Sequence, residues 1–116
     1  VEAVAMKNQK KALDYYYDLL ALKEPPMRIL YLITRQFNLL MQVKELAEEG
    51  YSAKTISERL KMAGFIVRNC LRQAEYFSLK TLKEALQDCV RMEEAVKTGR
   101  MNDVMSVELL LVKYSS

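Results

Sequence analysis

Hydrophobic residues recur along this chain every three or four positions, which is the spacing of one face of an α-helix. In the stretch from residue 8 to residue 24, for example, this spacing connects Ala12, Leu13, Tyr16, Leu19 and Leu20. No stretch of four to eight residues shows the strict alternation that is typical of a half-buried β-strand. The pattern therefore predicts an all-α protein.

Capping and helix-breaking residues divide the chain into about five to six helices. The expected N-caps are Asn8, Ser52, Ser78 and either Asn102 or Asp103. Prolines at 25 and 26 end one helix and suit the first turn of the next, and glycines at 50 and 99 mark helix ends. The expected helices are at about 9–24, 26–49, 53–61, 65–77, 79–98 and 104–113, after the end of a helix at 1–6 and with a turn at 62–64.

Length and composition agree with one globular unit. The chain has 116 residues, of which 51% are hydrophobic and 28% charged, and only three are Gly and two are Pro. This length is typical of one domain, and the hydrophobic fraction is normal for a globular core. Gly and Pro are too few for the many turns of a β-sandwich or barrel. We therefore expect residues 1–116 to form a single compact bundle of helices.

The chain is poorly equipped for chemistry. It contains no His, the commonest general base and metal ligand, and its three glycines are too far apart for a phosphate-binding loop. Cys70 and Cys89 lie in apolar stretches, so we expect buried thiols rather than a disulfide. We expect no enzyme, no cofactor, no bound metal and no small-molecule substrate. No apolar run approaches the roughly 20 residues that span a bilayer, so we also expect no membrane association.

Residues 52–77 could form a helix-turn-helix. This segment holds five basic and two acidic residues, an excess that equals the net charge of +3 of the whole chain. Its second helix would turn Arg68, Asn69, Arg72 and Gln73 outward, and these are side chains that read base edges in DNA. Its first turn, at 65–67, is apolar instead, which is typical of packing. A DNA-binding domain of a regulator remains an alternative.

Two stretches carry more apolar surface than a small core needs. Three consecutive tyrosines at 15–17 cannot all face one core, because successive helical residues point about 100° apart. Tyr16 continues the apolar face, so Tyr15 or Tyr17 is expected at a partner surface, where aromatic residues are enriched. In the last helix seven of the nine residues at 104–112 are apolar, so either this helix lies at the centre of the bundle or one side of it meets another subunit. In the second case we expect Leu109 and Leu111 to contact that subunit.

Three sequence stretches together resemble the C-terminal domain of the delta subunit of bacterial DNA polymerase III, a part of the clamp loader. RQFNLLMQVKEL at 35–46 is similar to the central helix of that family, and AEYFSLKTL at 74–82 is similar to its next junction. EEAVKTGR at 93–100 is similar to its acidic turn before an apolar helix. The chain departs from the family at Glu93, where Asp is usual, and at 62–65, where a Pro is missing.

The resemblance implies a non-catalytic domain in a collar of equivalent domains from the clamp-loader subunits. The implied partners are the delta-prime and gamma/tau subunits, and the sliding clamp and primer-template DNA would be reached only through the complex. The implied location is the bacterial cytoplasm, at the nucleoid. Because the chain opens at Val1, without Met and inside an apolar pattern, we expect a fragment whose parent has further N-terminal domains.

Overall fold

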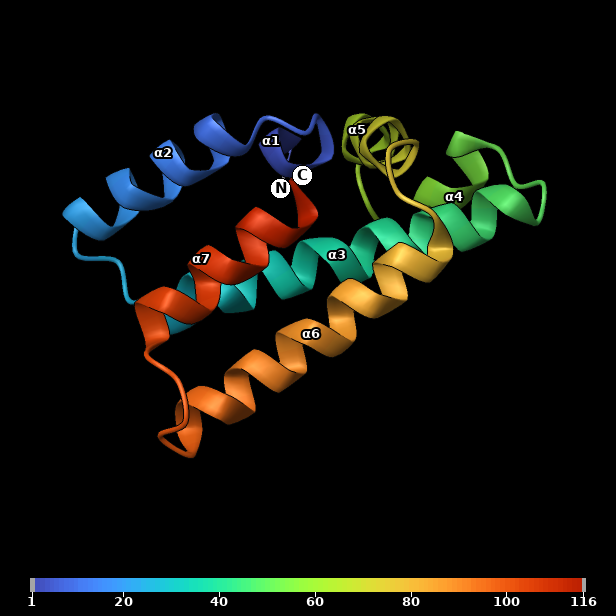
Figure 1. Ribbon diagram of the computed structural model, residues 1–116. Coiled ribbons are helices and arrows are strands. Elements are labelled where there is room, and N and C mark those ends of the chain that lie inside the picture. The colour runs from blue at the N-terminus through green and yellow to red at the C-terminus, as the bar shows by residue number, and fades with distance from the viewer. Residues whose placement is uncertain (1, 116) are drawn as a thin grey trace.

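The computed structural model describes residues 2–115, and within this range the chain folds into seven helices with no strands (Figure 1). This confirms the expected all-α fold. Six helices have eight residues or more, and α1 has four. The helices are α1 (Glu2–Ala5), α2 (Gln9–Ala21), α3 (Pro26–Glu48), α4 (Ala53–Leu60), α5 (Gly64–Ala74), α6 (Leu79–Lys97) and α7 (Asp103–Tyr114).

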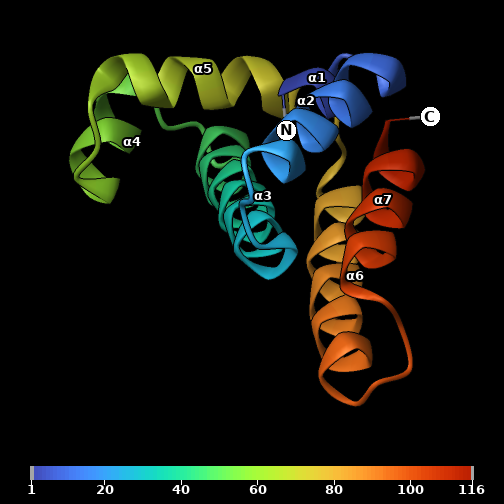
Figure 2. The same cartoon turned by 90° about the vertical axis from the view of Figure 1, so that its left-hand side faces the viewer.

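The long helix α3 is the centre of the molecule. It packs against α4, α5, α6 and α7, and α6 runs back along it in the opposite direction (Figure 1). Its residues Phe37, Leu40 and Val43 are at most 1% exposed. Figure 2 shows α5 and the α1–α2 pair above α3 and α6, and hydrogen bonds from Gln36 and Lys44 of α3 reach α5. A helix apolar around much of its circumference thus has partners on several sides, as its sequence predicts.

The expected N-caps are confirmed at four helices. In each case the side-chain oxygen accepts a hydrogen bond from a backbone N–H two or three residues later, at 2.9–3.3 Å. These bonds satisfy N–H groups that have no partner inside the helix. The capping residues are Asn8 on α2, Ser52 on α4, Ser78 on α6 and Asn102 on α7.

The junction between α4 and α5 differs from the expected turn at 62–64. Gly64 is the first residue of α5, and the left-handed residue that ends α4 is Lys61, with φ of 54°. A Cβ at Gly64 would lie 3.2 Å from a guanidinium nitrogen of Arg68. Because Arg68 is exposed and its side chain is flexible, this contact does not require a glycine at position 64. Similarly, α2 ends at Ala21, before the expected end, because Lys23 is left-handed with φ of 63°.

Both cysteines are buried, unpaired thiols, as expected. Burial raises the pKa of Cys70 and of Cys89 above the usual thiol value. Within residues 2–115, no helix is long and apolar enough to cross a membrane. Nor does this part of the chain bring three His, Cys, Asp or Glu side chains together where they could hold a metal ion.

Candidate protein-interaction surface

The three consecutive tyrosines of α2 point in three directions. Tyr16 is buried, and its hydroxyl donates a hydrogen bond of 2.9 Å to the carbonyl of Val104, which attaches α2 to α7. Burial, together with nearby Glu108, raises the pKa of Tyr16 to about 12. Tyr15 is 54% exposed and Tyr17 is 45% exposed. The middle of α2 thus has one tyrosine in the core, where it contacts α7, and one exposed tyrosine on either side of it.

Helix α7 separates its apolar residues into an inner and an outer face. Val107, Leu110 and Leu111 are buried, whereas Met105 and Leu109 are 53% and 46% exposed. Leu111 is therefore a correction to the expectation: only 7% of it is exposed, and it is a core residue. The reason is helical geometry, because Leu111 lies one turn after Val107 on the face that packs on the bundle.

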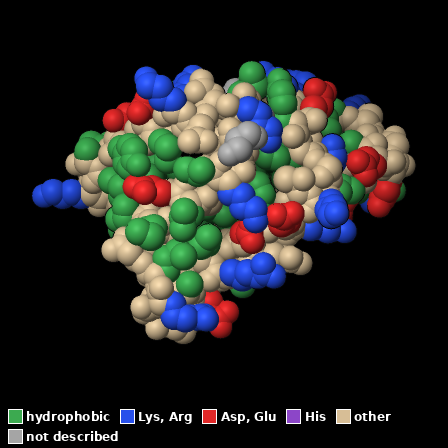
Figure 3. Space-filling view, viewed as in Figure 1, with side chains coloured by type: hydrophobic (Ala, Val, Ile, Leu, Met, Phe, Trp, Pro, Cys, Tyr) green, Lys and Arg blue, Asp and Glu red, His purple; other side chains and the backbone are tan. Residues whose placement is uncertain are grey.

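Tyr17, Met105 and Leu109 together form what we call the α2/α7 surface. Interaction with the nearby Glu108 of α7 raises the pKa of Tyr17 of α2. Figure 3 shows hydrophobic side chains gathered on the side of the molecule where α2 and α7 lie. Exposed aromatic and large aliphatic side chains in one place are typical of protein contacts.

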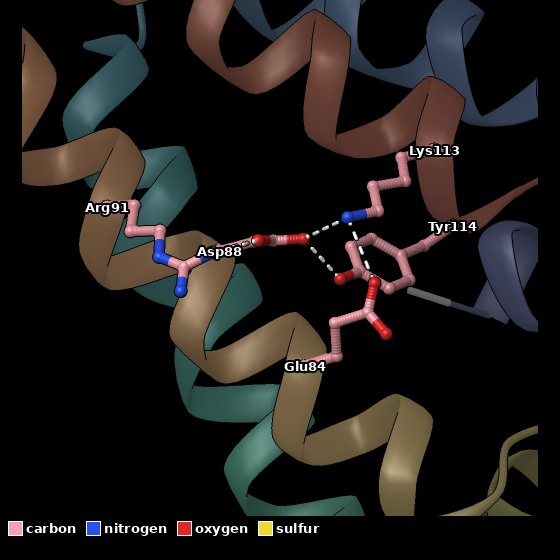
Figure 4. Close-up of polar contacts among 5 residues, drawn as sticks. All are labelled: Glu84, Asp88, Arg91, Lys113 and Tyr114. Atoms are coloured by element: carbon pink, nitrogen blue, oxygen red, sulfur yellow. Dashed lines mark hydrogen bonds and ion pairs between the residues drawn. The ribbon is translucent and has the colours of Figure 1, made fainter.

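A polar cluster holds α7 against α6 and so positions this surface (Figure 4). Lys113 donates to Asp88 at 2.7 Å and to Glu84 at 3.0 Å, and the hydroxyl of Tyr114 also donates to Asp88. A guanidinium nitrogen of Arg91 lies 3.7 Å from the other oxygen of the Asp88 carboxylate. The buried carboxylate therefore has partners on both oxygens, as a buried charge requires.

The hydrogen bonds decide the ionisation of Asp88. Burial alone would raise the pKa of this carboxyl, but the bonds from Lys113 and Tyr114 outweigh burial and lower it below its usual value. Burial and the bond to Asp88 raise the pKa of Tyr114. At neutral pH the cluster is therefore a charged, structural contact between α6 and α7.

The α5 residues of the DNA-binding alternative do not form one polar face. Arg68, Asn69 and Arg72 are exposed, but Gln73 is half-buried and accepts a hydrogen bond of 3.4 Å from Gln36 of α3. The apolar first turn of α5 was expected to pack against the core, but of its three apolar residues only Val67 is buried. Phe65 and Ile66 are 61% and 36% exposed.

Comparison with known proteins identifies the family. The family model described as the C-terminal domain of the DNA polymerase III delta subunit matches residues 1–114. The chain belongs to this family. It is 33% identical over 113 residues to DNA polymerase III subunit delta of Bacillus subtilis (strain 168), which covers 97% of the chain. The solved structure of the Bacillus subtilis DNA clamp loader delta protein superposes with a TM-score of 0.90 at 33% identity, again over 97% of the chain.

The resemblance drawn from residues 35–46, 74–82 and 93–100 is confirmed by this match. The match also overturns the alternative of a regulator's helix-turn-helix domain, since residues 52–77 fall inside a delta C-terminal domain with the same fold as its relative. A short helix, a tight turn and a second helix are shared by many folds, and here they pack on α3. The chain spans about one third (33%) of the length of the relatives that it matches.

Sequence reasoning missed Met105, which completes the α2/α7 surface. Its only signal is position, one helical turn before Leu109 on the same side of α7. It also missed the exposed side chains of Leu22, Tyr31 and Val90. Each of these belongs to an apolar stretch whose burial depends on tertiary packing, which periodicity alone does not resolve.

Proposed function

We propose that this delta C-terminal domain is a non-catalytic oligomerisation module of a bacterial clamp loader, forming part of a collar of equivalent domains. Its partners are the delta-prime and gamma/tau subunits. It reaches the sliding clamp and primer-template DNA only through the assembled complex, in the bacterial cytoplasm. The parent protein supplies further N-terminal domains, and residues 1–116 act as one unit.

The observation that supports this proposal is the α2/α7 surface. Three large side chains, Tyr17, Met105 and Leu109, are about half exposed on adjacent helices that Tyr16 and the Asp88 cluster hold in place. Such residues are the usual anchors of interfaces when a partner covers them. The structural relative is a DNA clamp loader delta protein, which indicates the kind of assembly.

Binding of the delta-prime and gamma/tau subunits of the same bacterium tests the proposal. We expect Leu109→Ser and Tyr17→Ser each to weaken binding by about tenfold or more in isothermal titration calorimetry, because interface anchors cost at least about 1–2 kcal/mol when truncated. Val90→Ser on α6 is the matched control, since Val90 is 60% exposed on another helix. Equal effects of all three changes would contradict the proposal.

A further inference from the structure

A groove opens between α2 and α3 on a different flank of α2 from Tyr17. It has a volume of about 190 Å³, and Tyr15 and Leu19 of α2 and Ile29 and Ile33 of α3 are among its lining. Leu111, which was expected at an interface, also contributes to this lining. A cavity of roughly 150 Å³ with apolar walls accepts a benzene-sized group. The groove can therefore take a large apolar side chain from outside.

Exposed apolar side chains of α2 border the groove. Tyr15 and Leu19 line it one helical turn apart and are 54% and 38% exposed, and Leu22, 76% exposed, continues this side of α2 at its C-cap beyond the groove. An apolar groove of this kind is the type of site in which the apolar face of an amphipathic partner helix lies.

One end of the groove carries the positive charge of Lys11. A second hollow, of about 240 Å³, shares Ala3 and Tyr15 with the groove and is lined by Lys11 as well. The ammonium of Lys11 lies over the ring of Tyr15, 5.6 Å from its centre. Among the described residues no carboxylate lines either hollow, and the nearby Asp14 pairs with Lys10 at 3.8 Å. The charge of Lys11 is therefore available to a partner.

We propose that this groove holds an amphipathic helix of a neighbouring clamp-loader subunit, with apolar side chains in the groove and an Asp or Glu that pairs with Lys11. The proposal rests on the function proposed above and adds a second contact, distinct from the α2/α7 surface. An apolar groove with one cationic end favours such a helix over a basic or uncharged one, because the wrong charge would leave Lys11 repelled or unpaired.

Two substitutions and their controls test the groove, with the delta-prime and gamma/tau subunits of the same bacterium as probes. We expect Leu19→Ser to weaken binding of one of them by about tenfold or more, as loss of a buried anchor does. Lys11→Glu should weaken the same binding, with Lys11→Arg close to wild type. Lys10→Glu makes the same change of net charge at the preceding position, which lines neither hollow, and should leave binding nearly unchanged. Circular dichroism confirms that each variant is folded.

The outcomes separate this proposal from the proposed function. If Leu19→Ser and Lys11→Glu bind like wild type while Leu109→Ser does not, the groove proposal is wrong and the function stands. If the wild-type chain binds neither subunit, both fail. If the wild-type chain instead associates with itself and Leu19→Ser abolishes this, the occupant is a second copy and the proposed partner is wrong.

Discussion

Leu109 and Leu111 are separated by one residue on α7, and the helix turns their side chains about 200° apart. Leu109 is 46% exposed and Leu111 is 7% exposed. We expect Leu111→Ala to lower the free energy of unfolding by about 2–5 kcal/mol, since it leaves a cavity in the core. Leu109→Ala should cost much less, within roughly 1 kcal/mol. Urea unfolding followed by circular dichroism measures both, and equal losses would mean that α7 is rotated from the orientation described.

Asp88 makes stability depend on pH in a defined direction. Its pKa is lowered in the folded chain by the bonds from Lys113 and Tyr114, so it stabilises the fold above its unfolded pKa of about 4, and this stabilisation is lost as the pH falls through the folded pKa. Asp88→Asn should lower stability at pH 7 by about 1–3 kcal/mol and flatten the decline in acid. Urea unfolding at neutral and acid pH measures this.

The control for Asp88 is Glu93→Gln. Glu93 pairs with Lys97 at 2.8 Å, as their i,i+4 spacing predicts, but both side chains are more than half exposed. An exposed pair of this kind contributes little to stability. An acid profile that changes as much in Glu93→Gln as in Asp88→Asn would show that the buried cluster has no special part in the pH dependence.

At the scale of elements, helix starts follow directly from the sequence, whereas burial within apolar helices does not. Ser78 and Asn102 cap their helices as predicted, because capping depends on residues two or three positions away. The left-handed Lys61 was missed because a lysine carries no local signal for that conformation. In α7 seven of nine residues are apolar, so the sequence could not distinguish the core residue Leu111 from the exposed Leu109.

The cap of α6 gives a prediction at this scale. The hydroxyl of Ser78 accepts a hydrogen bond of 3.0 Å from the N–H of Thr81 at the start of the helix that runs along α3. Ser78→Ala should lower the free energy of unfolding by about 0.5–2 kcal/mol, and Ser78→Gly by only a few tenths. Thermal unfolding of both variants tests this, and an unchanged Ala variant would show that the cap contributes nothing.

At the scale of the whole molecule, a central α3 buries the core and leaves apolar side chains on more than one outer side. The exposure of Tyr15 and Tyr17 could be predicted from the arc that three tyrosines cover on a helix. The groove could not, because its lining comes from four different helices, α1, α2, α3 and α7, whose relative placement depends on tertiary packing. The family resemblance, by contrast, depends on three local stretches of sequence, and the match to the family model confirms it.

Sedimentation velocity of this chain, alone and mixed with the delta-prime and gamma/tau subunits of its bacterium, tests the central claim most directly. The account predicts a mixed species that sediments faster than any component and contains this chain. It also predicts that Leu109→Ser, which alters only an exposed residue of α7, reduces that species while Val90→Ser does not. If no mixed species forms at concentrations well above the dissociation constants of typical stable complexes, the oligomerisation function is contradicted.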